Sequence, residues 1–157
     1  MALDREEYAA QEAELDELYR EIILDHYRSP RNRGALTVPS VSRDGFNPLC
    51  GDDIRLDLSI GDDTIEDVRF QGRGCSISQS SASMMTEAIK GKTMARAQEL
   101  MALFTAMMQG ADNVDLEALG DLEALVGVRK FPVRVKCATL AWHTLEEALK
   151  DYVRSRR

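Results

Sequence analysis

The sequence of 157 residues has little or nothing of several features, and each shortage excludes a class of protein. Its three cysteines are an odd number, whereas a disulfide framework needs pairs and an oxidising compartment. Its apolar runs are only a few residues long, which excludes a membrane span of about 20 apolar residues. Its 20 basic residues are outnumbered by 27 acidic ones, so a general nucleic-acid binder is disfavoured. No internal repeat, low-complexity tract or linker is present.

Charge is unevenly distributed along the chain. Residues 1–19 hold seven acids and one base, whereas residues 128–136 hold four bases and no acid. The acidic start lacks the basic or apolar opening of a signal or transit peptide, and we expect a cytoplasmic protein without a membrane or nucleic-acid partner. In the cytoplasm, three widely spaced cysteines are buried thiols, metal ligands or reactive thiols.

The hydrophobic spacing predicts a single α+β domain over residues 1–157. Residues 13–28 have apolar residues at helical spacing, which predicts an amphipathic helix. This apolar stripe does not continue before residue 13, so residues 1–12 are expected to be frayed. Apolar and polar residues alternate over 54–60 and 65–70 on either side of Gly61-Asp62-Asp63, which is typical of a hairpin, and 39–47 is a candidate third strand.

Helical spacing returns after Cys75. One helix is expected to end at Gly91, and a second to run from Thr93 to Gly110. The acidic segment 112–127 is expected to form one or two helical turns, and Pro132 suits the first turn of a last helix. The prediction is an N-terminal helix, a three-stranded antiparallel sheet, and helices packed on the sheet.

The first cysteine lies in an irregular loop before a strand. Cys50 follows Pro48 and precedes Gly51, and Asp52 comes next. Across a glycine, the Cys50 thiolate and the Asp52 carboxylate can be aimed at one point. A turn with an incidental cysteine fits the same residues equally well.

Of the other two cysteines, one lies at the start of a predicted helix and the other lies within one. Cys75 follows Gly74 where a strand hands over to a helix, and a helix N-terminus favours a thiolate, although a buried structural thiol is the alternative. Cys137 lies on the apolar stripe of the last helix and by periodicity is more typical of core. Against that, Arg134 and Lys136 are cations that would stabilise its charged form.

Three thiolates and Asp52 are four ligands of the kind that tetrahedral zinc takes, although their spacing matches no CxxC ribbon. Such a site is formally a dianion, which is costly to bury without nearby cations. The candidates are the basic residues near these cysteines in sequence, whose alternative is an ordinary solvated surface: Arg73, Arg129, Lys130, Arg134 and Lys136. His26 on the first helix and His143 on the last are not expected to contribute.

Three segments resemble the U-type iron–sulfur cluster assembly family: NPLCGDD, GRGCSISQSSASMM and KFPVRVKCATLAW. LYREIILDHYRSPRNRG is similar to the opening of that family, and the resemblance spans about residues 15–150. The scaffold branch, the IscU type, typically has histidine before the third cysteine, where this chain has Lys136. That residue and the long segment between Cys75 and Cys137 resemble the SufU branch.

The resemblance implies a fold and a sulfurtransferase-like function. It implies a zinc protein that accepts persulfide sulfur from a SufS-type cysteine desulfurase and serves the downstream Suf scaffold machinery. Its zinc ligands would be Cys50, Asp52, Cys75 and Cys137, and Cys50 would receive the sulfur after a desulfurase histidine replaces it on the metal. Arg134 is the candidate for steadying the charged intermediate, with a surface salt bridge as the alternative.

Two other functions remain open at this point. A Cys₃Asp site can hold an iron–sulfur cluster, so the chain could be a scaffold for [2Fe–2S] assembly. It could also be a structural zinc-binding module, although structural sites mostly use cysteine and histidine rather than aspartate.

Overall fold

The main helices and strands form where the hydrophobic spacing predicts them. The computed structural model describes residues 4–156, apart from the side chains of residues 8 and 12–15. In chain order the elements are α1 (Arg5–Arg28), β1 (Val41–Asn47), β2 (Asp52–Gly61), β3 (Thr64–Arg73), α2 (Ser76–Ile89), α3 (Met94–Met108), α4 (Leu116–Leu119), the 3₁₀ helix η1 (Gly120–Lys130) and α5 (Pro132–Ser155).

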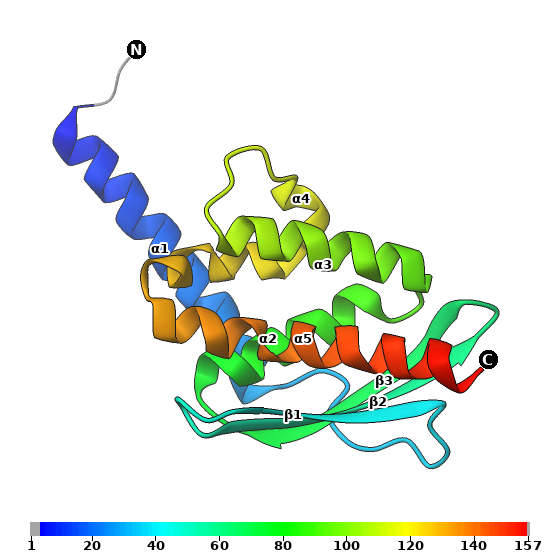
Figure 1. Cartoon of the computed structure of the whole chain (residues 1–157). Coiled ribbons are helices and arrows are strands. Elements are labelled where there is room, and N and C mark those ends of the chain that lie inside the picture. The colour runs from blue at the N-terminus through cyan, green and yellow to red at the C-terminus, as the bar shows by residue number, and fades with distance from the viewer. Residues whose placement is uncertain (1–3, 157) are drawn as a thin grey trace.

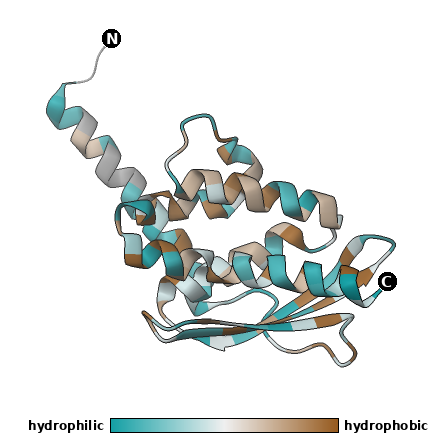
Figure 2. Cartoon of the chain, viewed as in Figure 1, coloured by the Kyte–Doolittle hydropathy of each residue, from teal (hydrophilic) through white to brown (hydrophobic). Residues whose placement is uncertain are grey.

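The three strands form one antiparallel sheet in the order β1-β2-β3. A two-residue turn joins β2 to β3, and both turn residues, Asp62 and Asp63, have positive φ (51° and 59°). Such a turn has the twist of the flanking strands, which is why it suits a hairpin. Figure 2 shows hydrophobic and hydrophilic residues alternating along β2, whose Ile54, Leu56 and Leu58 are buried.

Helices cover one face of the sheet in two layers. α5 packs on β1 and β2, and α2 packs on β3 and on α5. α3 and α4 lie farther from the sheet, beyond α2 and α5 (Figure 1). The arrangement is the α+β fold that the sequence predicts, with its core between the sheet and the helices.

α1 begins earlier than the apolar stripe, which starts at residue 13. Asp4 accepts a hydrogen bond from the Glu7 backbone N–H (2.8 Å), and the Glu7 carboxylate accepts one from the Asp4 N–H (3.2 Å). This capping box starts the helix at Arg5, because it satisfies backbone donors that a helix end leaves free. Part of the expected frayed segment, residues 1–3, lies outside the described residues, and the first turns of α1 extend away from the other elements in Figure 1.

The acidic segment after α3 is more helical than expected. A single turn, α4, is followed directly by η1, which reaches Lys130 just before α5. Leu119, Leu122, Leu125 and Val128 are all buried and recur every third residue. Because a 3₁₀ helix has three residues per turn, this spacing places the four side chains on one face.

None of the helices described in residues 4–156 has the length and apolarity of a membrane span.

Candidate metal centre

The residues of the predicted site meet at one end of the sheet. Asn47 at the end of β1 pairs with Asp52 at the start of β2, so the loop that carries Cys50 closes between these two residues. Cys75 stands between β3 and α2, and Cys137 lies in the second turn of α5, which packs on β1 and β2. Strand pairing and helix packing therefore bring together residues that are far apart in sequence.

Three of the four predicted ligands form a compact cluster. The ligand atoms of Cys50, Asp52 and Cys137 all lie within 4.8 Å of one another. The Sγ atoms of Cys50 and Cys137 are 3.1 Å apart. Asp52 and Cys137 are completely buried, whereas Cys50 is partly exposed. The cluster is thus open to solvent from the side of the Cys50 loop.

Two hydrogen bonds orient the Asp52 carboxylate. Its Oδ1 accepts from the Cys75 backbone N–H (3.0 Å), and its Oδ2 accepts from Asn47 Nδ2 (3.4 Å). The same Asn47 nitrogen lies 3.7 Å from the Cys137 sulfur. Asn47 therefore touches two of the clustered groups, although its residue type alone does not mark it as part of the site.

Two glycines permit this geometry. Gly51 has a φ of +69°, a conformation that residues with a side chain rarely adopt, and it turns the chain between Cys50 and Asp52. At Gly74 a Cβ atom would lie 2.5 Å from Asp52 Oδ1. The absence of a side chain at position 74 therefore lets the strand-to-helix junction approach the carboxylate.

Cys75 is not within the 4.8 Å group that the other three residues form. It is the N-cap residue of α2, and its backbone N–H, rather than its thiol, contacts Asp52. Its thiol is nevertheless near the cluster, because it contributes to the raised pKa of Cys137. The structure places Cys75 beside the three-residue cluster, and its role as a fourth ligand remains a prediction.

Burial dominates the chemistry of the Cys137 thiol. Burial raises the pKa of Cys137 well above its usual value, and hydrogen bonds with Cys50 and Asp52 raise it further. In the metal-free protein, burial therefore outweighs the effect expected of Arg134 and Lys136, and their role toward the charged thiol stays a prediction. A divalent cation would reverse the balance, because metal binding displaces thiol protons.

Arg134 is exposed on the first turn of α5. The charge of Cys75 is the main cause that raises the pKa of Arg134, and Cys137 and Cys50 contribute as well. Among the ion pairs of the described residues, none joins Arg134 to a carboxylate, so the salt-bridge alternative has no partner there. The guanidinium therefore lies near the three thiols, and its role as their countercharge stays a prediction.

Other predicted cations and both histidines lie elsewhere or are exposed. Arg129 donates to the Met107 carbonyl (3.4 Å), and Arg73 is exposed. His143 is exposed on α5, whereas His26 is completely buried against Ser83 and Asp121.

The donor set fits zinc. Thiolates and a carboxylate are ligands that Zn²⁺ takes, and a fourth ligand would close a tetrahedral site. A buried carboxylate with hydrogen bonds to both oxygens is the oriented kind of ligand that such sites use. The residues present can therefore hold the metal that the sequence predicts.

Comparisons with known proteins identify the family of this chain. Residues 18–157 match the family described as the NifU-like N terminal domain. The chain is 53% identical over 137 residues to a protein of Bacillus subtilis named zinc-dependent sulfurtransferase SufU, covering 87% of this chain and 92% of that protein. It is 45% identical over 139 residues to the iron–sulfur cluster assembly scaffold protein IscU of Streptococcus pyogenes, covering 88% and 86%.

A solved structure extends the likeness to three dimensions. The SufU of Fervidobacterium islandicum, described as an iron–sulfur cluster assembly scaffold protein for the SUF system, has a TM-score of 0.79 and 39% identity. The similarity covers 82% of this chain and 94% of that one. Sequence, fold and donor set agree, and the chain belongs to the NifU-like N-terminal domain family, which includes the SufU and IscU proteins.

Proposed function

We propose that this protein is a zinc-dependent sulfur carrier that accepts persulfide sulfur from a SufS-type cysteine desulfurase for iron–sulfur cluster assembly. The observation that carries the proposal is the cluster of Cys50, Asp52 and Cys137 at the end of the sheet, with Cys50 on its exposed side. The similarity to the zinc-dependent sulfurtransferase supports the same function. A cytoplasmic location and delivery to downstream Suf scaffold machinery follow from the proposal as predictions.

The residues that would hold Zn²⁺ are Cys50, Asp52, Cys75 and Cys137. When bound, the metal keeps the thiols deprotonated and adds no redox chemistry of its own. Asp52 is already oriented through both of its oxygens, and Arg134 supplies positive charge beside an anionic site. Each of these features belongs to the chain itself.

Cys50 is the cysteine best placed to accept sulfur. Cys137 is completely buried, and Cys75 is fixed at the N-cap of α2, where its own N–H is bonded to Asp52. Cys50 and Cys75 are both partly exposed, but Cys50 lies in the loop between β1 and β2, which turns at Gly51, rather than at a helix N-cap. A partner can therefore approach the Cys50 sulfur without opening the core.

The transfer conserves electrons. The Cys50 thiolate attacks the outer sulfur of the partner's persulfide, a new sulfur–sulfur bond forms on Cys50, and the partner's bond breaks. The partner cysteine leaves as a thiolate, and no external oxidant or reductant is consumed. Arg134 offsets negative charge on the sulfurs during this exchange, because its guanidinium interacts with all three cysteines.

The test is sulfide release by a SufS-type desulfurase supplied with cysteine and reductant. Zinc-loaded protein at substoichiometric amounts should accelerate release over many turnovers, and Cys50→Ala should abolish the acceleration. Ser29→Ala, a change of similar size in an exposed loop, is the control and should leave it unchanged. Undiminished sulfur flow in Cys50→Ala would sink the proposal. No acceleration by the wild type, together with binding of iron and sulfide, would indicate the [2Fe–2S] scaffold instead.

A further inference from the structure

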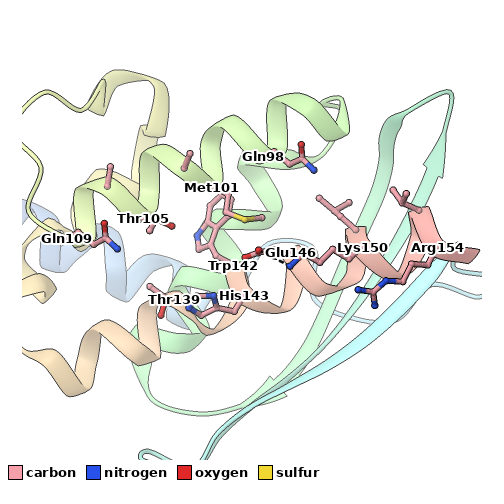
Figure 3. Close-up of a pocket in the computed structure, with 14 residues that line it drawn as sticks. Gln98, Met101, Thr105, Gln109, Thr139, Trp142, His143, Glu146, Lys150 and Arg154 are labelled. Carbon is pink, nitrogen blue, oxygen red and sulfur yellow. Dashed lines mark ion pairs between the residues drawn. The ribbon is translucent and has the colours of Figure 1, made fainter.

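A groove separate from the cysteine cluster runs between α3 and α5 (Figure 3). Its volume is about 740 Å³, within the usual size range of small-molecule sites. The α3 wall includes Met101, Ala102 and Ala106, and the α5 wall includes Trp142, Leu149 and Val153. None of the predicted metal ligands lines it.

The charged side chains at this groove are already paired. Lys150 lies 3.2 Å from Glu146, and Arg154 lies 3.9 Å from Asp151. The remaining polar side chains on the walls, such as Thr105, carry no charge, apart from His143. The His143 side chain is exposed to solvent. The groove therefore favours an uncharged, mainly apolar occupant over an ion.

Trp142 provides the polar contact that would orient such an occupant. The indole is only 2% exposed and is stacked on Phe104, with ring centroids 5.3 Å apart. Its Nε1–H is buried, and no described residue accepts a hydrogen bond from it. In Figure 3 the indole nitrogen is directed toward the end of the groove where Thr105 and Thr139 lie.

A buried donor without an acceptor is unfavourable, because folding removes it from water without replacing the lost hydrogen bond. A ligand that brings an acceptor to this nitrogen recovers that loss. The side chain of Met101 has three rotatable bonds, so this wall of the groove can move to admit the acceptor.

We propose that the groove between α3 and α5 is a binding site for a small, uncharged, mainly apolar molecule whose carbonyl oxygen accepts a hydrogen bond from Trp142 Nε1–H. The apolar body would lie along Met101, Leu149 and Val153. This site is independent of the sulfur chemistry proposed above, and its failure would leave that chemistry untouched.

Acetophenone and ethylbenzene are the probes, because they share a shape and only the first has a carbonyl oxygen. Trp142 is the only tryptophan of the chain, so its indole gives one resonance in a ¹⁵N–¹H spectrum of the zinc-loaded protein. Acetophenone should shift this resonance saturably and bind about fivefold more tightly than ethylbenzene, the preference that one added hydrogen bond gives.

Two alanines on α3 supply a blocking variant and its control. Ala102→Phe fills the groove and should abolish acetophenone binding, whereas Ala95→Phe changes an exposed alanine outside it and should not. Trp142→Phe should bind both probes equally in ligand-detected titrations, since it removes the donor. The proposal is overturned if acetophenone causes no saturable shift, if Ala102→Phe binds it normally, or if Trp142→Phe keeps the preference.

Discussion

At the scale of single residues, the arrangement of the metal centre depends on Asn47 as well as on the predicted ligands. Its side chain donates to Asp52 and lies beside the Cys137 sulfur, and its own Oδ1 accepts from the Leu49 N–H (3.2 Å). Asn47 therefore links the end of β1 to the Cys50 loop and to the carboxylate. A residue that orients a metal ligand typically affects metal affinity by one to two orders of magnitude.

Replacement of Asn47 by alanine should weaken zinc binding about tenfold, because Asp52 loses the donor to one oxygen. Competition with a chromophoric chelator measures this affinity. Asn113→Ala, which changes an exposed asparagine in the loop before α4, serves as the control. An affinity within twofold of the wild type would show that Asn47 does not orient the carboxylate.

The cluster of Cys50, Asp52 and Cys137 could be predicted from sequence because these side chains are metal ligands by chemistry, whereas Cys75 as a fourth ligand stays a prediction. Asn47 could not, because an amide next to a proline is equally typical of a turn. The raised pKa of Cys137 could not be predicted from the sequence either. Neighbouring cations are visible in the chain, but the burial that outweighs them is a property of the fold.

At the scale of secondary-structure elements, polar contacts join α1 to α2 and η1. Tyr19 donates to Glu123 on η1 (2.9 Å), and His26 bonds Ser83 on α2 and Asp121 on η1 (2.8 Å each). Ser83 also accepts from the Arg31 N–H (2.9 Å), so its hydroxyl is free to donate to His26. The C-terminal half of α1 is thus bonded to two other helices at once.

Loss of the Tyr19 hydroxyl should cost stability in a pH-dependent way. Burial, followed by the bond to Glu123, raises the pKa of Tyr19 to about 12, whereas the unfolded chain ionises near 10. The unfolded state releases its proton first, so the stabilisation is complete below pH 10 and is lost toward pH 12. Denaturant unfolding should show wild type losing its advantage over Tyr19→Phe across that window.

An advantage that stays constant from pH 9 to pH 12 would contradict this prediction. Tyr27→Phe, which removes the hydroxyl of an exposed tyrosine on the same helix, is the control.

The two histidines of the chain form a natural comparison. His26→Ala should destabilise the protein by about 2–4 kcal/mol, because it leaves a cavity and removes the acceptor to which the buried Ser83 hydroxyl donates. His143→Ala removes an exposed side chain and should change stability by less than about 0.5 kcal/mol. Equal effects in urea unfolding would contradict the role of the His26 contacts.

The boundaries of most elements were predictable because local signals set them. Gly91 and Gly110 have positive φ at the ends of α2 and α3, Thr93 caps α3, and Pro132 opens α5. The length of η1 was underestimated, although the apolar residues that recur every third position are visible in the sequence. A run of leucines at that spacing is read as an ordinary helical turn until its burial on one face is known.

At the scale of the whole molecule, the candidate metal centre brings together segments that are far apart in the sequence. Its residues come from the β1–β2 loop, β2, the β3–α2 junction and α5. These contacts have long sequence separations, so their convergence follows from the sheet order and the packing of α5, which no local pattern contains. A metal bound by all four predicted ligands would link the sheet to both of the helices that cover it.

Removal of zinc should therefore lower the stability of the whole domain. Ligands that bind only the folded state add their binding free energy to stability, and a structural zinc site contributes about 10 kcal/mol or more. Calorimetry before and after treatment with a chelator, with metal loss confirmed by elemental analysis, should show a large fall in Tm. A Tm unchanged after complete metal loss would mean that the site does not stabilise the fold.

The most direct test of the central claim locates the transferred sulfur. The zinc-loaded protein is mixed with a SufS-type desulfurase and cysteine, the thiols are blocked, and each cysteine peptide is weighed by mass spectrometry. In the wild type we expect a mass gain of one sulfur atom on Cys50. In Cys50→Ala we expect no gain on the other two cysteines. A sulfur atom found on Cys75 or Cys137, in the wild type or in that variant, would contradict Cys50 as the acceptor.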